Sequence, residues 1–150
     1  MAIQYTHDVI IQRPVEEVYT YISDVRNAPE WMPWADEIAV IEGSEPTGVA
    51  EGQRRLIKQT DFGIQSETVL KATEVTPGQG YTFESISGPV AFRGTYRFES
   101  IQEGTRLTRT CHVELPGLKR IMEPLMAHRM KRRWEADLKR VKKRLEAGEE

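Results

Sequence analysis

Closely spaced turn signals divide the chain from residue 38 onward into short β-like segments. Turns that contain glycine or proline fall at residues 43–48, 60–63, 76–80, 87–89 and 102–104. Most of the connections are too short to hold a crossover helix, so neighbouring strands have to run antiparallel. The pattern predicts an antiparallel sheet with strands near residues 38–43, 52–60, 64–75, 80–87, 91–101 and 105–115.

These segments differ in how well their residues alternate. In 91–101 and 105–115, apolar and polar residues alternate along the strand, which is typical of a sheet with one buried face. Segments 52–60 and 64–75 alternate poorly. A β-bulge or a wet interior face would each explain this, and the sequence does not choose between them.

A further strand and two short helices are predicted before this region. Residues 3–11 alternate as a strand with one buried face. Pro14 then stands where a helix can begin, and apolar residues follow at helical spacing to Ile22. Residues 25–34 are predicted to form a second short helix or helical turn, interrupted by Pro29 and Pro33.

The chain is predicted to end in a long helix with two apolar stripes. The first consists of Leu118, Ile121, Met122 and Leu125, and the second of Met126, Met130, Trp134, Leu138, Val141 and Leu145. The stripes do not align on a straight helix, and Pro124 lies where one gives way to the other. We therefore expect the helix to bend or restart near Pro124.

Length and composition indicate one globular domain, residues 1–150. Hydrophobic residues make up 39% of the chain and charged residues 29%, with a net charge of −2. The single cysteine, Cys111, excludes an internal disulfide. The N-terminus does not resemble a signal peptide, and no apolar run approaches the ~20 residues of a membrane span. The sequence thus predicts a cytoplasmic protein without integral membrane association, and gives no sign of a nucleic-acid partner, cofactor or metal site.

Charge is distributed unevenly along the chain. Residues 119–150 carry eleven Lys and Arg against six acids, whereas residues 1–118 carry ten against seventeen. The basic side chains opposite the second stripe are predicted to form a solvated helix face, although they could also meet an anionic partner. They are Arg129, Arg132, Lys139, Arg140 and Lys143.

An antiparallel sheet with one apolar face and a long helix with an apolar stripe can bury both only against each other. This order of elements, with three segments of the chain, resembles the START/SRPBCC superfamily, and its polyketide cyclase/dehydrase-like branch in particular. The segments are VIIQRPVEEVYTYISDVRNAPEWMPW, GTYRFESIQEGTRLTRTCHVELPG and LKRVKKRLE. The resemblance covers nearly the whole chain and implies the α+β helix-grip fold. In that fold a seven-stranded curved antiparallel sheet wraps around a long C-terminal helix, and two short helices follow the first strand.

The segment PEWMPW, residues 29–34, is also similar to an aromatic-proline segment in the quinone-binding branch of this superfamily. The resemblance implies that the two short helices lie across one end of the sheet, by the mouth of a cavity. For Trp31 we favour a role in filling the core. For Trp34 the core and the cavity wall remain equally open.

Aromatic residues of two neighbouring strands point by parity to one side of the predicted sheet. Core packing alone would explain them, but the resemblance favours a partly open interior, which aromatic and methionine side chains commonly line. The candidate ligand-binding residues are Trp34, Tyr81, Phe83, Phe92, Tyr96, Phe98, Arg109, Met122, Leu125 and Met126.

His7 and Arg109 are the only catalytic candidates. Both share the buried parity of their strands, which the resemblance makes neighbours. No acid shares that parity on either strand, because Asp8 and Glu114 point the other way. An inward guanidinium is costly without a partner, so Arg109 is predicted to face water or a ligand oxygen, with His7 nearby as a proton-exchanging group. Cys111 is more simply a small core residue than a nucleophile.

Three functions stay open from the sequence. The leading hypothesis is binding, transport or sequestration of an apolar or aromatic small molecule, such as a lipid, polyketide or quinone. The first alternative is a cyclase/dehydratase-type enzyme that uses His7 and Arg109, although no catalytic motif is present. The second is a protein-interaction module that uses the basic C-terminal helix. Fold resemblance alone does not choose among them, and the sequence does not indicate an oligomeric state.

Overall fold

A computed structural model describes residues 2–43, 47–61, 63–114 and 123–147. Seven strands in this part of the chain form one sheet. They are β1 (Ala2–Ile11), β2 (Ala35–Glu42), β3 (Arg54–Asp61), β4 (Ile64–Thr76), β5 (Gly80–Ser87), β6 (Ala91–Ile101) and β7 (Gly104–Glu114).

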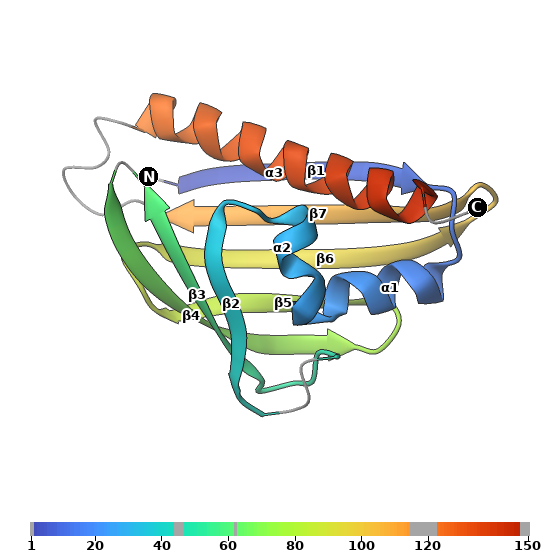
Figure 1. Cartoon of the computed structure of the whole chain (residues 1–150), viewed down its shortest axis with the longest axis horizontal. Helices are drawn as coiled ribbons and strands as arrows, with labels where there is room; N and C mark the ends of the chain where they lie inside the picture. The colour runs from blue at the N-terminus through green and yellow to red at the C-terminus, as the bar shows by residue number, and fades with distance from the viewer. Residues whose placement is uncertain (1, 44–46, 62, 115–122, 148–150) are drawn as a thin grey trace.

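The strands follow the order β1-β7-β6-β5-β4-β3-β2, and every neighbouring pair is antiparallel. All pairs except β1–β7 are consecutive in the chain, as the short turns predict. The sheet curves so that β2 and β3 lie in front of β5 and β6 (Figure 1). The predicted α+β helix-grip fold is confirmed. Strand β2 starts earlier than expected, directly after Trp34.

Within the described ranges, four helical segments accompany the sheet. They are α1 (Val15–Ser23), the 3-10 helix η1 (Val25–Asn27), α2 (Ala28–Trp31) and α3 (Glu123–Ala147). Pro29 lies in the first turn of α2, where its missing N–H leaves no bond unmade. Helix α3 runs along β1 and β7, while α1 and α2 lie beside it over the sheet (Figure 1). No helix in the described ranges is long and apolar enough to cross a membrane.

The long helix begins at Glu123, with Pro124 in its first turn. Trp134, Leu138 and Val141 of the second stripe are buried, and Met126 and Met130 are partly buried. The first stripe up to Met122 lies outside the described residues, so the prediction of a bend stays open.

The structure explains why some strands alternate clearly between apolar and polar residues and others alternate poorly. Along β6, Tyr96 and Phe98 are buried, whereas Arg93 and Arg97 are exposed. In β3 the inward positions include Arg55 and Gln59, so this strand has a partly polar interior face. Strand β4 has register shifts against β5 at Val69/Leu70 and Ala72/Glu74. The poor alternation therefore has both causes that the sequence left open.

Trp31 lies in the main core, between the short helices and α3. Its side chain is 2% exposed and packs in a cluster with residues such as Val18, Leu107 and Leu138. A second cluster joins Trp134 to Cys111 and neighbouring side chains under the N-terminal half of α3. Helix α2 is thus fixed by the tryptophan at its end.

We predict that Trp31→Ala lowers the free energy of unfolding by about 3–5 kcal/mol, because it removes a fully buried aromatic side chain and leaves a cavity. Urea denaturation followed by circular dichroism measures this. The control is Leu125→Ala, which removes a side chain that is 60% exposed and is expected to cost less than ~0.5 kcal/mol. Equal effects of the two substitutions would contradict the assignment of Trp31 to the core.

Candidate ligand-binding site

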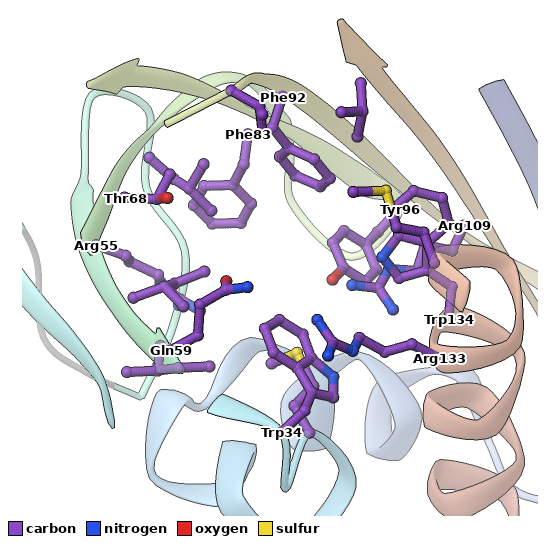
Figure 2. Close-up of a pocket in the computed structure, with 17 residues that line it drawn as sticks. Trp34, Arg55, Gln59, Thr68, Phe83, Phe92, Tyr96, Arg109, Arg133 and Trp134 are labelled. Carbon is purple, nitrogen blue, oxygen red and sulfur yellow. The ribbon is translucent and has the colours of Figure 1, made fainter. Parts of the chain in front are cut away.

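A cavity of about 140 Å³ lies between the curved sheet and α3 (Figure 2). It adjoins an outer groove of about 360 Å³. The cavity and the groove share Gln59, Val90, Met130 and Arg133, so the groove forms the mouth of the cavity. The cavity is lined by Met32, Trp34, Ile38, Arg55, Ile57, Gln59, Thr68, Leu70, Phe83, Val90, Phe92, Tyr96, Arg109, Val113, Met130, Arg133 and Trp134.

The wall is mainly apolar because successive strands place alternate side chains inward. Ile57 from β3, Leu70 from β4 and Phe83 from β5 lie on one side of the space. Phe92 and Tyr96 come from β6 and face it from the neighbouring part of the sheet (Figure 2). An apolar wall with a few polar groups is the usual composition of a small-molecule pocket.

Arg109 projects from β7 into this interior and is neutralised by an acid on α3. Its Nη1 lies 3.0 Å from Oδ2 of Asp137, and the side chains are 5% and 0% exposed. The guanidinium also faces the rings of Trp31 and Tyr96, at 5.8 and 5.3 Å from their centroids. The prediction that Arg109 lacks an acidic partner is wrong, since that partner comes from the helix and not from a strand.

Asp137 accepts hydrogen bonds from more than Arg109. The indole Nε1 of Trp34 donates to its two oxygens at 3.0 and 3.1 Å, and Arg140 Nη1 lies 3.3 Å from Oδ1. Burial raises the pKa of the Asp137 carboxyl, while Arg109 and the Trp34 N–H oppose that rise. This buried carboxylate joins α3 to β7 and to the segment that connects α2 with β2.

The two tryptophans of PEWMPW have different environments. Trp31 is in the core, and its Nε1 makes no hydrogen bond within the described residues. Trp34 is partly exposed, lines the cavity and is fixed by Asp137. Pro33 between them is exposed and lies outside the helix, so the backbone can turn the two rings in different directions.

Arg133 and Asp61 connect the two sides of the mouth. The Arg133 Nη2 donates to Oδ1 of Asp61 at 2.9 Å, which links α3 to the end of β3. The same guanidinium lies 4.9 Å from the centre of the Trp34 ring. This cation and its aromatic neighbour therefore lie where the groove adjoins the cavity.

The structure brings together only some of the predicted ligand-binding residues. Trp34, Phe83, Phe92, Tyr96 and Arg109 line the cavity, and Met126 lines the groove.

Three predicted residues lie elsewhere. Tyr81 and Phe98 pack with Tyr19 in the core behind the cavity wall. Leu125 is 60% exposed on the first turn of α3. Their placement in the wall is not supported, and Met122 lies outside the described residues.

His7 lies opposite Arg109 in the β1–β7 pair, which confirms that the two strands are neighbours and that these residues share a face. However, His7 does not line the cavity. Its ring stacks on Tyr5, whose hydroxyl lies 3.3 Å from Nδ1 and donates to Glu135 of α3 at 2.9 Å. The proposed pair of His7 and Arg109 is therefore not assembled around the space that a ligand would occupy.

Cys111 is 1% exposed in the second core cluster, and burial raises the pKa of its thiol. Both properties suit a packing role better than a nucleophile. Among the described residues, no group of three His, Cys, Asp or Glu side chains is arranged to hold a metal ion.

The sequence reasoning missed Arg55, Gln59 and Asp137. Asp137 lies in helical phase with Trp134, Leu138 and Val141. An acid on the apolar face of the last helix indicates a buried carboxylate that needs a partner, and this could have identified it from the sequence. Arg55 and Gln59 share strand parity with Ile57, but the weak alternation of this segment hid their inward direction.

We predict that Asp137→Asn costs about 3–5 kcal/mol of unfolding free energy, because it leaves the buried Arg109 guanidinium without its counter-ion. The double variant Arg109→Met/Asp137→Leu removes both charges and is expected to be more stable than the single variant. Urea denaturation of the wild type and the two variants measures this order. A double variant that is less stable than Asp137→Asn would contradict it.

Known structures share this fold. A crystal structure of a Thermus thermophilus protein superposes with a TM-score of 0.81 at 19% identity, covering 100% of both chains. The Zhui aromatase/cyclase of a Streptomyces species gives a TM-score of 0.76 at 17% identity, covering 97% of this chain and 94% of that one. A START superfamily protein of Mycobacterium smegmatis gives 0.69 at 13% identity, covering 95% and 97%. At these identities the likeness is one of fold.

Sequence comparison gives a more specific result. The chain is 26% identical over 113 residues to the ribosome association toxin RatA of Vibrio cholerae serotype O1, a match that covers 75% of this chain and 71% of that protein. Residues 2–146 match the family model described as polyketide cyclase / dehydrase and lipid transport. Because that match spans nearly all of the chain, this protein belongs to the polyketide cyclase/dehydrase and lipid transport family.

Proposed function

We propose that this protein binds an apolar or aromatic small molecule in the cavity between the sheet and α3. The observation that supports this most is the wall itself, in which inward aromatic and aliphatic side chains surround an open space and do not meet in a closed core. Hydrogen-bonded strands form the wall and Asp137 orients Trp34, which supports a pocket whose shape is formed before a ligand binds. Binding, transport or sequestration requires nothing beyond this arrangement.

The family supports the same proposal at a coarser level. Its description combines polyketide cyclase/dehydrase activity with lipid transport, and polyketides and lipids are both largely apolar molecules. The structural neighbours include an aromatase/cyclase and a START superfamily protein. Lipids, polyketides and quinones are the ligand classes that fit an apolar and aromatic wall.

A cyclase/dehydratase-type activity has less support. The described cavity wall contains no His, Cys, Asp or Glu side chain, and His7 lies outside it. Apart from the arginines, Tyr96 is the titratable residue among the described lining residues, and burial raises the pKa of its phenol. An enzyme of this kind would have to use Tyr96 together with the guanidinium groups.

A second candidate function is an interaction module that uses the basic face of α3. Arg132, Lys139 and Lys143 are exposed on that helix, as predicted, whereas Arg140 pairs with Asp137. The relative RatA is described as a ribosome association toxin, which gives this face a candidate anionic partner. Cosedimentation with ribosomes, lost when these three residues are changed to Gln, would favour this candidate over small-molecule binding.

We predict that the neutral fluorophore N-phenyl-1-naphthylamine binds in the cavity with enhanced emission, and that Ile57→Trp reduces its affinity at least tenfold by filling the space. Fluorescence titration measures this. The control is Leu56→Trp, because the preceding residue points to the other face of β3.

Circular dichroism establishes that both variants are folded. The outcome against the proposal is either no binding by the wild type or equal loss of affinity in the two variants. Equal loss would place the fluorophore outside the cavity.

A further inference from the structure

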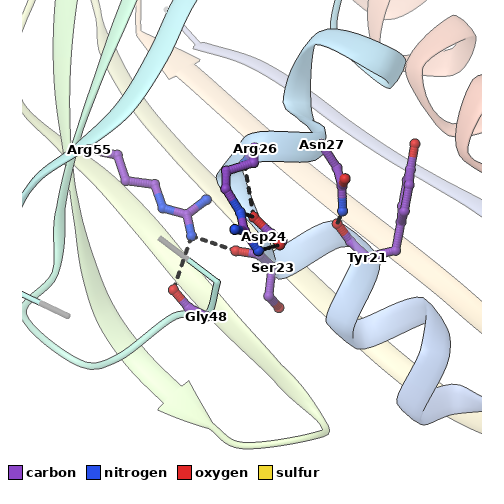
Figure 3. Close-up of polar contacts among 7 residues, drawn as sticks. All are labelled: Tyr21, Ser23, Asp24, Arg26, Asn27, Gly48 and Arg55. Atoms are coloured by element: carbon purple, nitrogen blue, oxygen red, sulfur yellow. Dashed lines mark hydrogen bonds and ion pairs between the residues drawn. The ribbon is translucent and has the colours of Figure 1, made fainter. Parts of the chain in front are cut away.

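Among the residues that the structure describes, three guanidinium groups line the cavity, and two of them have a carboxylate partner. Arg109 lies 3.0 Å from Asp137, and Arg133 lies 2.9 Å from Asp61. Arg55 makes no ion pair within the described residues. Asp24 acts on it electrostatically but is already paired with Arg26 at 2.7 Å (Figure 3). Since none of the described Asp or Glu residues lines the inner cavity, Arg55 is a cavity cation without an ion-pair partner in the described part of the chain.

Arg55 is held firmly in place by neutral acceptors. Its Nε donates to Oε1 of Gln53 at 2.8 Å. Its Nη2 donates to the carbonyl oxygens of Ser23 and Gly48 at 2.7 and 3.3 Å (Figure 3). These contacts fix the direction of the guanidinium. Its remaining nitrogen, Nη1, makes no hydrogen bond to any residue that the structure describes.

This arrangement has an energetic cost that its neighbours offset only in part. The Arg55 side chain is 8% exposed, and burial lowers the pKa of its guanidinium. Its Cζ lies 5.1 Å from the centre of the Phe83 ring, and Ser23 provides the partly negative C-terminal end of α1. Neither neighbour carries a full negative charge. An anion from outside the protein would complete the neutralisation.

A second hydrogen-bond donor faces the same space. Tyr96 is 9% exposed, and its hydroxyl makes no hydrogen bond in the described part of the chain. Figure 2 shows the phenol oxygen turned toward the interior of the cavity. Arg55 and Arg109 favour negative charge near this phenol, whereas Asp137 and Cys111 oppose them. The hydroxyl is therefore a donor that an acceptor inside the cavity could satisfy.

We propose that the ligand of this protein is an acid, and that its carboxylate binds at Arg55, with the Tyr96 hydroxyl as a further donor, while its apolar body fills the remaining cavity. The proposal deepens the proposed function and rests on it. Arg55 is preferred to Arg109 because Asp137 already neutralises Arg109, whereas the free Nη1 of Arg55 can donate a charge-assisted hydrogen bond. Arg55 then sets specificity for acidic ligands over neutral ligands of the same shape.

Competition between matched ligands tests this. The displacement of N-phenyl-1-naphthylamine by octanoate and by octanol is measured for the wild type, Arg55→Met and the control Arg54→Met. Arg54 is a suitable control because its side chain lies on the other face of β3 and pairs with Glu42. We expect the wild type and Arg54→Met to prefer octanoate at least about tenfold, as one charge-assisted hydrogen bond allows. Arg55→Met is expected to lose the preference while its affinity for octanol stays within about twofold.

The outcomes separate this proposal from the function on which it rests. If the fluorophore does not bind the wild type, the proposed function fails. If it binds and both ligands displace it equally, or if Arg55→Met keeps the preference for octanoate, the function stands and the role of Arg55 is overturned.

A crystal structure of the wild type with octanoate decides the matter if Arg55→Met does not fold. We expect the carboxylate within about 3 Å of Arg55 Nη1. A carboxylate at Arg133 in the mouth, or no bound octanoate, overturns the proposal.

Discussion

The buried carboxylate of Asp137 fixes the relative positions of the long helix α3, strand β7 and the PEWMPW segment. It lies on the apolar face of α3 and receives hydrogen bonds from Arg109 of β7 and from Trp34 after α2. A desolvated carboxylate is tolerated only when its oxygens are paired, so helix, sheet and PEWMPW segment have to occupy definite relative positions. The same contacts neutralise Arg109 and orient Trp34 along the cavity. Fold and site thus depend on one hydrogen-bond network. Apolar packing alone would fix the relative positions of these elements less uniquely.

The cavity follows from where this network places α3. The helix lies along β1 and β7, so the curved part of the sheet formed by β3, β4 and β5 is not covered by it (Figure 1). Side chains from those strands, among them Ile57, Leu70 and Phe83, face an open space. The short helices close one end, where Trp31 fills the core. When one helix packs against a strongly curved sheet, a space remains between them that can hold a small molecule unless side chains fill that space.

Sequence reasoning was accurate where the information is local. Short turns and alternating residues predict the seven antiparallel strands, and the helical phase of Trp134, Leu138 and Val141 predicts the buried face of α3. It was weaker for the site, because site residues meet across the fold. Strand parity places Arg109 inside correctly, yet its partner Asp137 comes from another element. Parity also gives Tyr81 and Phe98 the right face but cannot distinguish a core position from a cavity wall. Arg55 escaped notice because polar inward residues break the very pattern that identifies a strand face.

The central claim is that this interior carries a small molecule. Native mass spectrometry of the freshly purified protein, compared with the denatured protein from the same preparation, tests it most directly. We expect an additional species in the native spectrum, heavier than the chain by the mass of a small organic molecule, which disappears on denaturation. The released molecule should extract into an organic solvent after acidification. A native spectrum of the bare chain alone, unchanged after incubation with a lipid extract, would contradict the claim.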